Sequence, residues 1–99
     1  MTRWVAWFDD DPAATAIREK FSADHLAYLD RHRDQILLPG GLRDAAGGTL
    51  IGGLWVLDVE RREEAAALCE NDPFFRHGLR KRYHLRVWGK AFPDRMVAL

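Results

Sequence analysis

Residues 49–59 read TLIGGLWVLDV, and this run carries the strongest strand signal in the chain. Its β-branched and aromatic side chains favour extended backbone, although Gly52-Gly53 weakens the pattern. A second apolar run, RWVAWF at residues 3–8, predicts another strand near the N-terminus. A strand with one face in water alternates apolar and polar residues, and neither of these runs does so. We therefore expect both faces of the sheet that contains them to be covered.

The remaining sequence completes a pattern of four strands and two helices. Asp11-Pro12 and Asp72-Pro73 each combine a helix-capping residue with proline at the first helical position. A break of the first helix near Phe21-Ser22 is an alternative to one continuous helix. The predicted elements, in chain order, are a strand at 3–8, a helix at 12–34, strands at 35–38 and 49–59, a helix at 60–71 and a strand at 79–92.

Glycine and proline mark the turns between these elements. Pro39-Gly40-Gly41 is a strong breaker after the second strand, residues 44–48 (DAAGG) form a flexible connection, and Gly78 can close the turn before the last strand. The order β-α-β-β-α-β is that of the ferredoxin-like α+β fold. It predicts a single domain over residues 1–99, with a four-stranded antiparallel sheet and both helices on one face. A second copy related by a two-fold axis is the simplest cover for the other face, so we predict a homodimer with its sheets packed face to face.

Composition excludes several classes of protein. The chain has 99 residues, of which 47% are hydrophobic and 30% charged, as expected for one globular domain. The 15 basic and 15 acidic residues cancel, which argues against a nucleic-acid partner. The single cysteine, Cys69, cannot form an internal disulfide and is predicted to be an inert core thiol. No apolar run approaches the ~20 residues of a membrane span, and the first residues lack a signal-peptide core, so we expect a cytoplasmic protein with no membrane partner.

His25 is the most informative candidate for chemistry. A desolvated histidine needs a polar partner, and the predicted topology brings the distant Asp72 to the same end of the fold. A carboxylate there would hold one imidazole tautomer and leave the other nitrogen to act as an acid or base. The alternatives are a core histidine bonded to a backbone carbonyl and an aspartate that only caps a helix. The apolar stripe that holds His25 consists of Ile17, Phe21, His25, Tyr28, Leu29 and His32.

Five further residues are predicted at the same end and would bind a substrate, with the aromatic rings as apolar walls. They are Trp7, Phe8, Gly40, Tyr83 and His84. The sequence contains no zinc-like spacing, nucleophilic serine motif or phosphate-binding glycine loop. We therefore expect neither a metal nor a cofactor.

A basic cluster near the last strand has three interpretations. It could bind nucleic acid, because aromatic residues interleave with the charges. Charged residues also protect an edge strand from aggregation, and the zero net charge favours this second interpretation. A third hypothesis is that Arg80 or Arg82 attracts an anionic substrate. The cluster consists of Arg76, Arg80, Lys81, Arg82 and Arg86.

Several runs together resemble the YCII-related family. They are HLAYLDRHRDQILLPGGLRD, REEAAALCENDPFFRHGL and VWGKAF, and the resemblance covers residues 4–92 with His25-Leu26 and Asp72-Pro73-Phe74 as its sharpest marks. It implies a dimeric α+β barrel of ferredoxin-like protomers, in which His25 and Asp72 match the family's proposed catalytic pair. Where a reaction is known in the family, the resemblance implies elimination of halide from a hydroxylated aromatic ring without a cofactor. The family often has Gly-Pro where Gly40-Gly41 stands here, and glycine loosens this turn at the pocket mouth.

Three functions fit these observations. The first is a small cofactor-independent enzyme in which His25 moves a proton, in an elimination or isomerisation of a small hydroxylated aromatic or enolisable substrate, while Asp72 orients the imidazole. The second is a non-catalytic dimer that binds a small molecule in the same pocket. The third is a structural dimer in which His25 and Asp72 serve only core bonding and capping. Turnover separates the first from the second, and loss of ligand effects in His25→Ala separates both from the third.

Overall fold

β1 (Thr2–Asp10) and β3 (Leu50–Val59) pair antiparallel at the centre of a four-stranded sheet, as the two strongest strand signals predict. In the computed structural model, which describes residues 1–99, β2 (Ile36–Arg43) and β4 (Arg80–Val87) are the outer strands. The strand order is β2-β3-β1-β4, and every pairing is antiparallel. The predicted ferredoxin-like α+β fold is confirmed.

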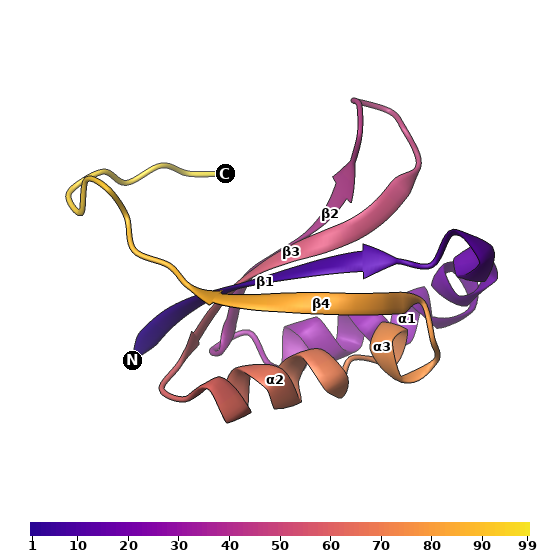
Figure 1. The fold of residues 1–99 in the computed structure, drawn as a ribbon, viewed down its shortest axis with the longest axis horizontal. Helices are drawn as coiled ribbons and strands as arrows, with labels where there is room; N and C mark the ends of the chain where they lie inside the picture. Colours follow the sequence, from indigo (N-terminus) through magenta and orange to yellow (C-terminus); the bar gives the residue numbers. More distant parts are fainter.

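The helices cover one face of this sheet. They are a short 3₁₀ helix, η1 (Pro12–Ala14), and the α-helices α1 (Thr15–Arg31), α2 (Arg62–Glu70) and α3 (Pro73–Arg76). Figure 1 shows the three α-helices together below the sheet, whereas the C-terminal segment after β4 and the connection between β2 and β3 rise above it. None of the helices combines the length and the apolar composition of a membrane-crossing segment.

The hydrophobic core lies between the sheet and the helices. Alternate side chains of the central strands point towards the helices, and Phe8, Trp55 and Leu57 are buried there. Tyr28 of α1 donates a hydrogen bond from its hydroxyl to the Leu68 carbonyl of α2, with 2.6 Å between the oxygens. Apolar burial supplies the main stabilisation of this layer, and the Tyr28 bond ties its two long helices together.

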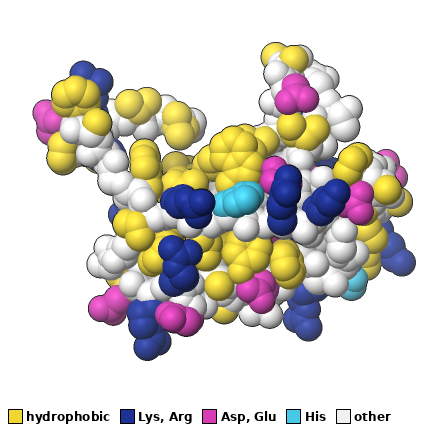
Figure 2. All heavy atoms as spheres, in the orientation of Figure 1, with side chains coloured by type: hydrophobic (Ala, Val, Ile, Leu, Met, Phe, Trp, Pro, Cys, Tyr) yellow, Lys and Arg dark blue, Asp and Glu magenta, His cyan; other side chains and the backbone are white.

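The opposite face carries apolar side chains that a single chain leaves uncovered. Trp7, Leu38 and Ile51 are each about half exposed there. Figure 2 shows apolar side chains gathered on this side, above a row of basic side chains along β4. The basic row lies on an outer strand, as the edge-protection interpretation requires. Cover of the apolar face by a second copy stays a prediction.

Two predicted boundaries are wrong, and one alternative is excluded. β2 continues through Pro39-Gly40-Gly41, because proline is tolerated on an outer strand, where one of its edges needs no ladder bonds. β4 ends at Val87 rather than at residue 92, because β1 offers no partner beyond the bond from the Trp88 N–H to the Arg3 carbonyl. α1 has no break at Phe21-Ser22, since no glycine or proline interrupts its sequence.

Gly52 and Gly53, which weaken the strand signal of β3, permit close packing against it. A Cβ at Gly52 would lie 2.1 Å from the backbone oxygen of Phe8 on β1, closer than non-bonded atoms can approach. A Cβ at Gly53 would lie 3.1 Å from Nη2 of Arg80. The two glycines therefore let β1 and the Arg80 side chain lie directly against β3.

Gly52→Ala is expected to lower the free energy of unfolding by about 3 kcal/mol, because both atoms in the clash belong to sheet backbone. Gly40→Ala is the matched control on β2. Its Cβ would meet only the Leu54 backbone oxygen at 4.0 Å, so we expect a change below about 1 kcal/mol. Urea unfolding followed by circular dichroism measures both values. Equal losses in the two variants would contradict the close contact at Gly52.

Buried hydroxyl and thiol groups predict a loss of stability at alkaline pH. Burial raises the pKa of Cys69 from 9.0 to about 12 and that of Tyr28 from 10.0 to about 12. The unfolded chain therefore releases these protons at a lower pH than the folded one. The stability that these groups contribute is present below about pH 9 and is lost as the pH rises towards 12.

The measurement is calorimetry of the wild type and Tyr28→Phe from neutral pH to about pH 11. Tyr28→Phe lacks the hydrogen bond to Leu68, so its melting temperature should already be lower at neutral pH. Its further decrease above about pH 9 should be shallower than in the wild type, because one of the titrating groups is gone. Parallel curves for the two proteins would show that the Tyr28 hydroxyl does not drive the alkaline loss.

Candidate active site

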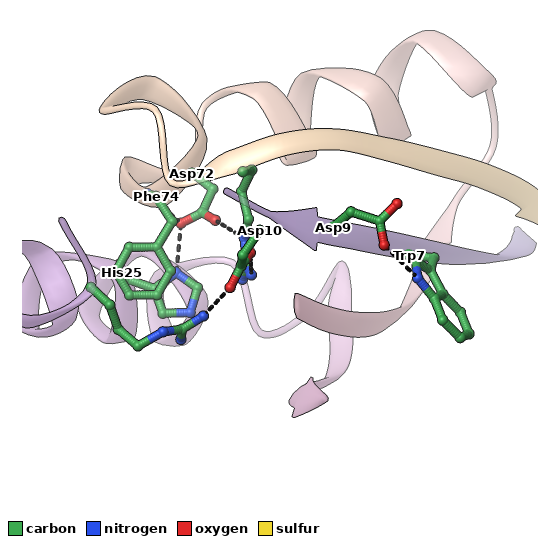
Figure 3. A network of polar contacts seen from close by, with 8 residues as sticks. Trp7, Asp9, Asp10, His25, Asp72 and Phe74 are labelled. Atoms are coloured by element: carbon green, nitrogen blue, oxygen red, sulfur yellow. Dashed lines mark hydrogen bonds and ion pairs between the residues drawn. The ribbon is translucent and has the colours of Figure 1, made fainter. Parts of the chain in front are cut away.

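His25 of α1 contacts Asp72, the residue that precedes α3, as the predicted topology requires. Nδ1 of His25 lies 2.6 Å from Oδ1 of Asp72, and Asp72 has no exposed surface. The same oxygen accepts a hydrogen bond from the Phe74 backbone N–H at 3.3 Å, so Asp72 also caps α3. Figure 3 shows the imidazole and the carboxylate facing one another. Asp72 both pairs with His25 and caps α3, so the alternative of an aspartate that only caps a helix is wrong.

The contact with Asp72 determines which nitrogen of His25 is free. An ionised carboxylate only accepts hydrogen bonds, so Nδ1 carries the proton and donates it to Asp72. Nε2 then carries the lone pair, and it has no hydrogen-bond partner within the chain. The ring is stacked on Phe74, with centroids 3.9 Å apart and an angle of 13° between the planes. This stacking and the Asp72 contact together hold the orientation of the imidazole.

A cleft of about 300 Å³ opens beside His25. This volume lies at the small end of the range for ligand sites and suits a single substituted ring. Of the lining residues, only His25 and Gly40 belong to the predicted site, and Arg80 to the hypothesis of an anionic substrate; Arg18, Trp55 and Phe74 are among those that the prediction missed. The residues that line the cleft are Arg18, Ser22, His25, Leu26, Leu29, Pro39, Gly40, Gly41, Arg43, Leu50, Gly52, Trp55, Phe74 and Arg80.

Arg80 belongs to this site, although the sequence groups it with a basic surface cluster. Its side chain is 3% exposed, Nη1 donates to Oδ1 of Asp10 at 2.7 Å, and Nε lies 3.8 Å from Oδ2 of Asp72. Asp10 also pairs with Arg18 of α1. The five side chains His25, Asp72, Arg80, Asp10 and Arg18 thus form one network, part of which Figure 3 shows. Within it, Nε of Arg80 and Oδ2 of Asp72 are buried without a hydrogen-bond partner.

Aromatic rings and a glycine enclose the guanidinium of Arg80. Its central carbon lies 4.7 Å from the ring centroid of Phe8 and 5.3 Å from that of Phe74, within the range of cation–π attraction. Gly53 of β3 leaves the space that the guanidinium occupies. Glycine inside a strand often marks the close approach of another group, so Gly53 is the sequence signal that points to a buried neighbour here.

Of the remaining predicted residues, Phe8 and Tyr83 point to the helix side of the sheet, and Gly40 of β2 reaches the cleft with its backbone. Gly40 lines the cleft. Phe8 is fully buried under Arg80 and does not reach the cleft. Tyr83 is directed towards α2, where its hydroxyl donates to Oε2 of Glu70 at 2.5 Å. Of these three, only Gly40 is placed to contact a ligand beside His25.

Trp7 and His84 lie on the opposite face of the sheet from His25. They are direct partners in the β1–β4 pairing, and each neighbours a residue whose side chain points to the helices. Figure 3 shows Trp7 with Asp9, to which its indole nitrogen donates at 3.2 Å, apart from the His25–Asp72 group. The topology places both residues near the correct end of the sheet, but strand alternation directs them away from the cleft.

Other ionisable side chains near the site are held in their neutral forms. Burial and the neighbouring Asp72 raise the pKa of Cys69 to about 12, which keeps the thiol protonated and fits the predicted inert core residue. Burial and the bond to Glu70 raise the pKa of Tyr83. No group of three or more His, Cys, Asp or Glu side chains is arranged to hold a metal ion.

Comparison with known proteins gives a family and similar solved structures. A family model described as the YCII-related domain matches residues 2–89. A search of curated proteins finds no match. The solved structure of 5-chloro-2-hydroxyhydroquinone dehydrochlorinase from Burkholderia phenoliruptrix AC1100, in complex with 2,5-dihydroxybenzoquinone, is 27% identical in sequence. It aligns with a TM-score of 0.79 over 88% of this chain and 93% of that chain.

The two comparisons agree with the resemblance seen in the sequence. The family model covers most of the chain, from the start of β1 to just beyond the end of β4. The structural neighbour is an enzyme that acts on a hydroxylated aromatic ring, and its protomer has the same fold. The chain belongs to the family of proteins with a YCII-related domain.

Proposed function

We propose that this protein is a small cofactor-independent enzyme that uses His25 as an acid or base on a hydroxylated aromatic or enolisable substrate. The reaction is an elimination or an isomerisation, both of which require the transfer of a proton. The observation that carries the proposal is the arrangement of His25 at the cleft: Nδ1 is held by buried Asp72, and Nε2 has no partner in the chain.

An elimination of halide illustrates the chemistry. The substrate reacts as a keto tautomer, in which the carbon that bears the halide is saturated. Nε2 of His25 accepts a proton from this tautomer, and the electrons of the broken bond to hydrogen form a new π bond. The halide leaves with the electrons of its bond to carbon. Asp72 then faces an imidazolium, whose positive charge its carboxylate stabilises. Asp72 acts through His25 and is a positioning residue, and release of the proton to solvent restores the starting state.

The structural neighbour supports the class of reaction and the class of substrate. Its name states that it removes chloride from a hydroxylated ring, and its complex contains a quinone of similar size. A cleft of about 300 Å³ has room for a ring of this kind beside His25.

His25→Ala is expected to lower kcat by about 10²- to 10⁴-fold, the usual contribution of a general acid or base. The assay measures chloride release and product absorbance with 5-chloro-2-hydroxyhydroquinone and related hydroxylated rings. Because the deleted ring is stacked on Phe74, free imidazole should fit the space and restore part of the activity. His32→Ala is the matched control: His32 ends the same helix outside the cleft, so its kcat should not change.

Asp72→Asn extends the same experiment to the positioning residue. Asparagine caps a helix as well as aspartate does, so α3 keeps its cap while the charge beside His25 is lost. We expect kcat to fall with little change in KM. Full turnover in His25→Ala would refute the proposal. A wild-type protein whose melting temperature rises with these rings, but which never converts them, would be a binding module instead.

A second part of the proposal is that two copies pack through the face opposite the helices. This face presents Trp7, Leu38 and Ile51 about half exposed, with Val5 and Val56 directly paired between β1 and β3. A contiguous apolar patch of this kind is a typical protein interface. A two-fold axis through the sheet would cover it with the same residues of the second copy.

Val56→Lys tests this interface because it places a charge at the centre of the uncovered face. Light scattering after gel filtration should give a wild-type mass of two 11.4 kDa chains and a mass close to one chain for the variant. Glu63→Lys, on the exposed surface of α2, changes charge on the helix side and should stay dimeric. A wild-type protein that is monomeric at low micromolar concentration would overturn the predicted dimer.

A further inference from the structure

The charged side chains that line the cleft are all basic, whereas the whole chain balances basic and acidic residues. The chain has equal numbers of basic and acidic residues, 15 of each. The lining includes Arg18, Arg43, Arg80 and His25, and it contains no aspartate or glutamate. The carboxylates of Asp10 and Asp72 lie behind the arginines and the histidine, almost wholly buried. A ligand in the cleft therefore meets the guanidinium donors and Nε2 of His25, but no carboxylate.

Arg80 has donors that the chain itself leaves unused. Its side chain is 97% buried, as its 3% exposure shows, yet only Nη1 makes a hydrogen bond, to Asp10. Nε is buried with no partner at hydrogen-bond distance, and Oδ2 of Asp72 lies 3.8 Å from it. Nη2 makes no hydrogen bond within the chain and is not among the fully buried atoms, so it is available at the cleft that Arg80 lines. A donor without a partner is unfavourable in a side chain buried to this degree, so such groups usually have one in the working molecule. An oxyanion in the cleft would give Nη2 that partner.

Arg18, His25 and Arg80 all lie close to the ring of Phe74. The guanidinium carbons of Arg18 and Arg80 lie 5.1 Å and 5.3 Å from the centroid of Phe74, and the His25 ring is stacked on it at 3.9 Å. All three side chains line the one cleft. A molecule of one ring can therefore reach Nε2 of His25 and an arginine at the same time. Trp55 and Leu29 supply apolar lining for the flat part of such a molecule.

We infer that the cleft selects small planar anions, in which an oxygen that carries negative charge is held by Arg80 and Arg18 while the ring lies beside His25. The class includes rings whose hydroxyl is conjugated to a carbonyl and is ionised at neutral pH. Guanidinium groups suit this ligand because they are planar, always charged and rich in donors. This inference rests on the proposed function for the role of His25 and adds the charge of the substrate to it. The same donors would stabilise negative charge that develops on oxygen when His25 removes a proton.

The test compares two rings that differ in charge. 2,5-Dihydroxybenzoquinone is anionic at neutral pH, whereas 2,5-dimethoxybenzoquinone has a similar shape and no charge. Isothermal titration calorimetry on the wild type should show the anion binding at least about tenfold more tightly. Arg18→Gln, which alters a partly exposed side chain, should reduce this preference several-fold, and Arg80→Gln should reduce it further.

Arg82→Gln is the matched control, because Arg82 lies on the same strand as Arg80 but pairs with Asp9 outside the cleft. It should keep the wild-type preference. Should Arg80→Gln fail to fold, Arg18→Gln and the control decide the matter. Equal binding of the two quinones to the wild type, binding of neither, or loss of the preference in Arg82→Gln to the same extent as in Arg18→Gln would overturn the inference.

The proposed function is judged separately by His25→Ala. This variant keeps both arginines and should still prefer the anion while its turnover is lost. If the wild type binds the two quinones equally and His25→Ala loses turnover, the inferred charge preference is refuted. The acid–base role of His25 then stands. If the wild type prefers the anion but never converts any ring, the inference of an anion site stands and the proposed enzymatic function is refuted.

Discussion

The buried carboxylate of Asp72 is the group on which the arrangement of the site depends. Transfer of a carboxylate out of water is costly unless other groups replace the lost hydrogen bonds. Oδ1 of Asp72 accepts hydrogen bonds from His25 on α1 and from the Phe74 N–H at the start of α3. Oδ2 has no hydrogen-bond partner, but the positive charge of Arg80 on β4 lies 3.8 Å from it. The requirement to satisfy one carboxylate therefore brings two helices and an outer strand together at one end of the fold. It also leaves Nε2 of His25 as the free polar atom at the cleft.

Arg80 of β4 connects the buried Asp72 with the sheet. Its guanidinium lies between the rings of Phe8 and Phe74, over the space that Gly53 leaves on β3. Asp10 neutralises it from β1 and is itself shared with Arg18. A buried ion-pair network of this kind is not by itself evidence of high stability, because desolvation offsets much of the attraction. The network holds its charged side chains in defined positions around the cleft.

The two faces of the sheet carry different groups. The helix side contains the core, the charged network and the cleft. The opposite side presents Trp7, Leu38 and Ile51 to solvent in a single chain. The chain belongs to the YCII-related family and is similar to an enzyme that acts on a hydroxylated ring. The helix side is where we place the proposed acid–base chemistry. The uncovered face is where we place the second copy, so that one sheet would serve both the site and the assembly.

Local sequence patterns determined the fold and the meeting of His25 with Asp72. Strand runs at 3–8 and 49–59, and two Asp-Pro caps, were enough to order the elements and to bring His25 and Asp72 to one end. Patterns could not assign faces, because both sides of the central strands are apolar. Only the packing of the helices decided that Trp7 and His84 point away from the cleft while Arg80 is buried beside it. The burial of Arg80 depends on contacts with Phe8, Asp10 and Gly53, which are distant in sequence and adjacent only in the folded sheet.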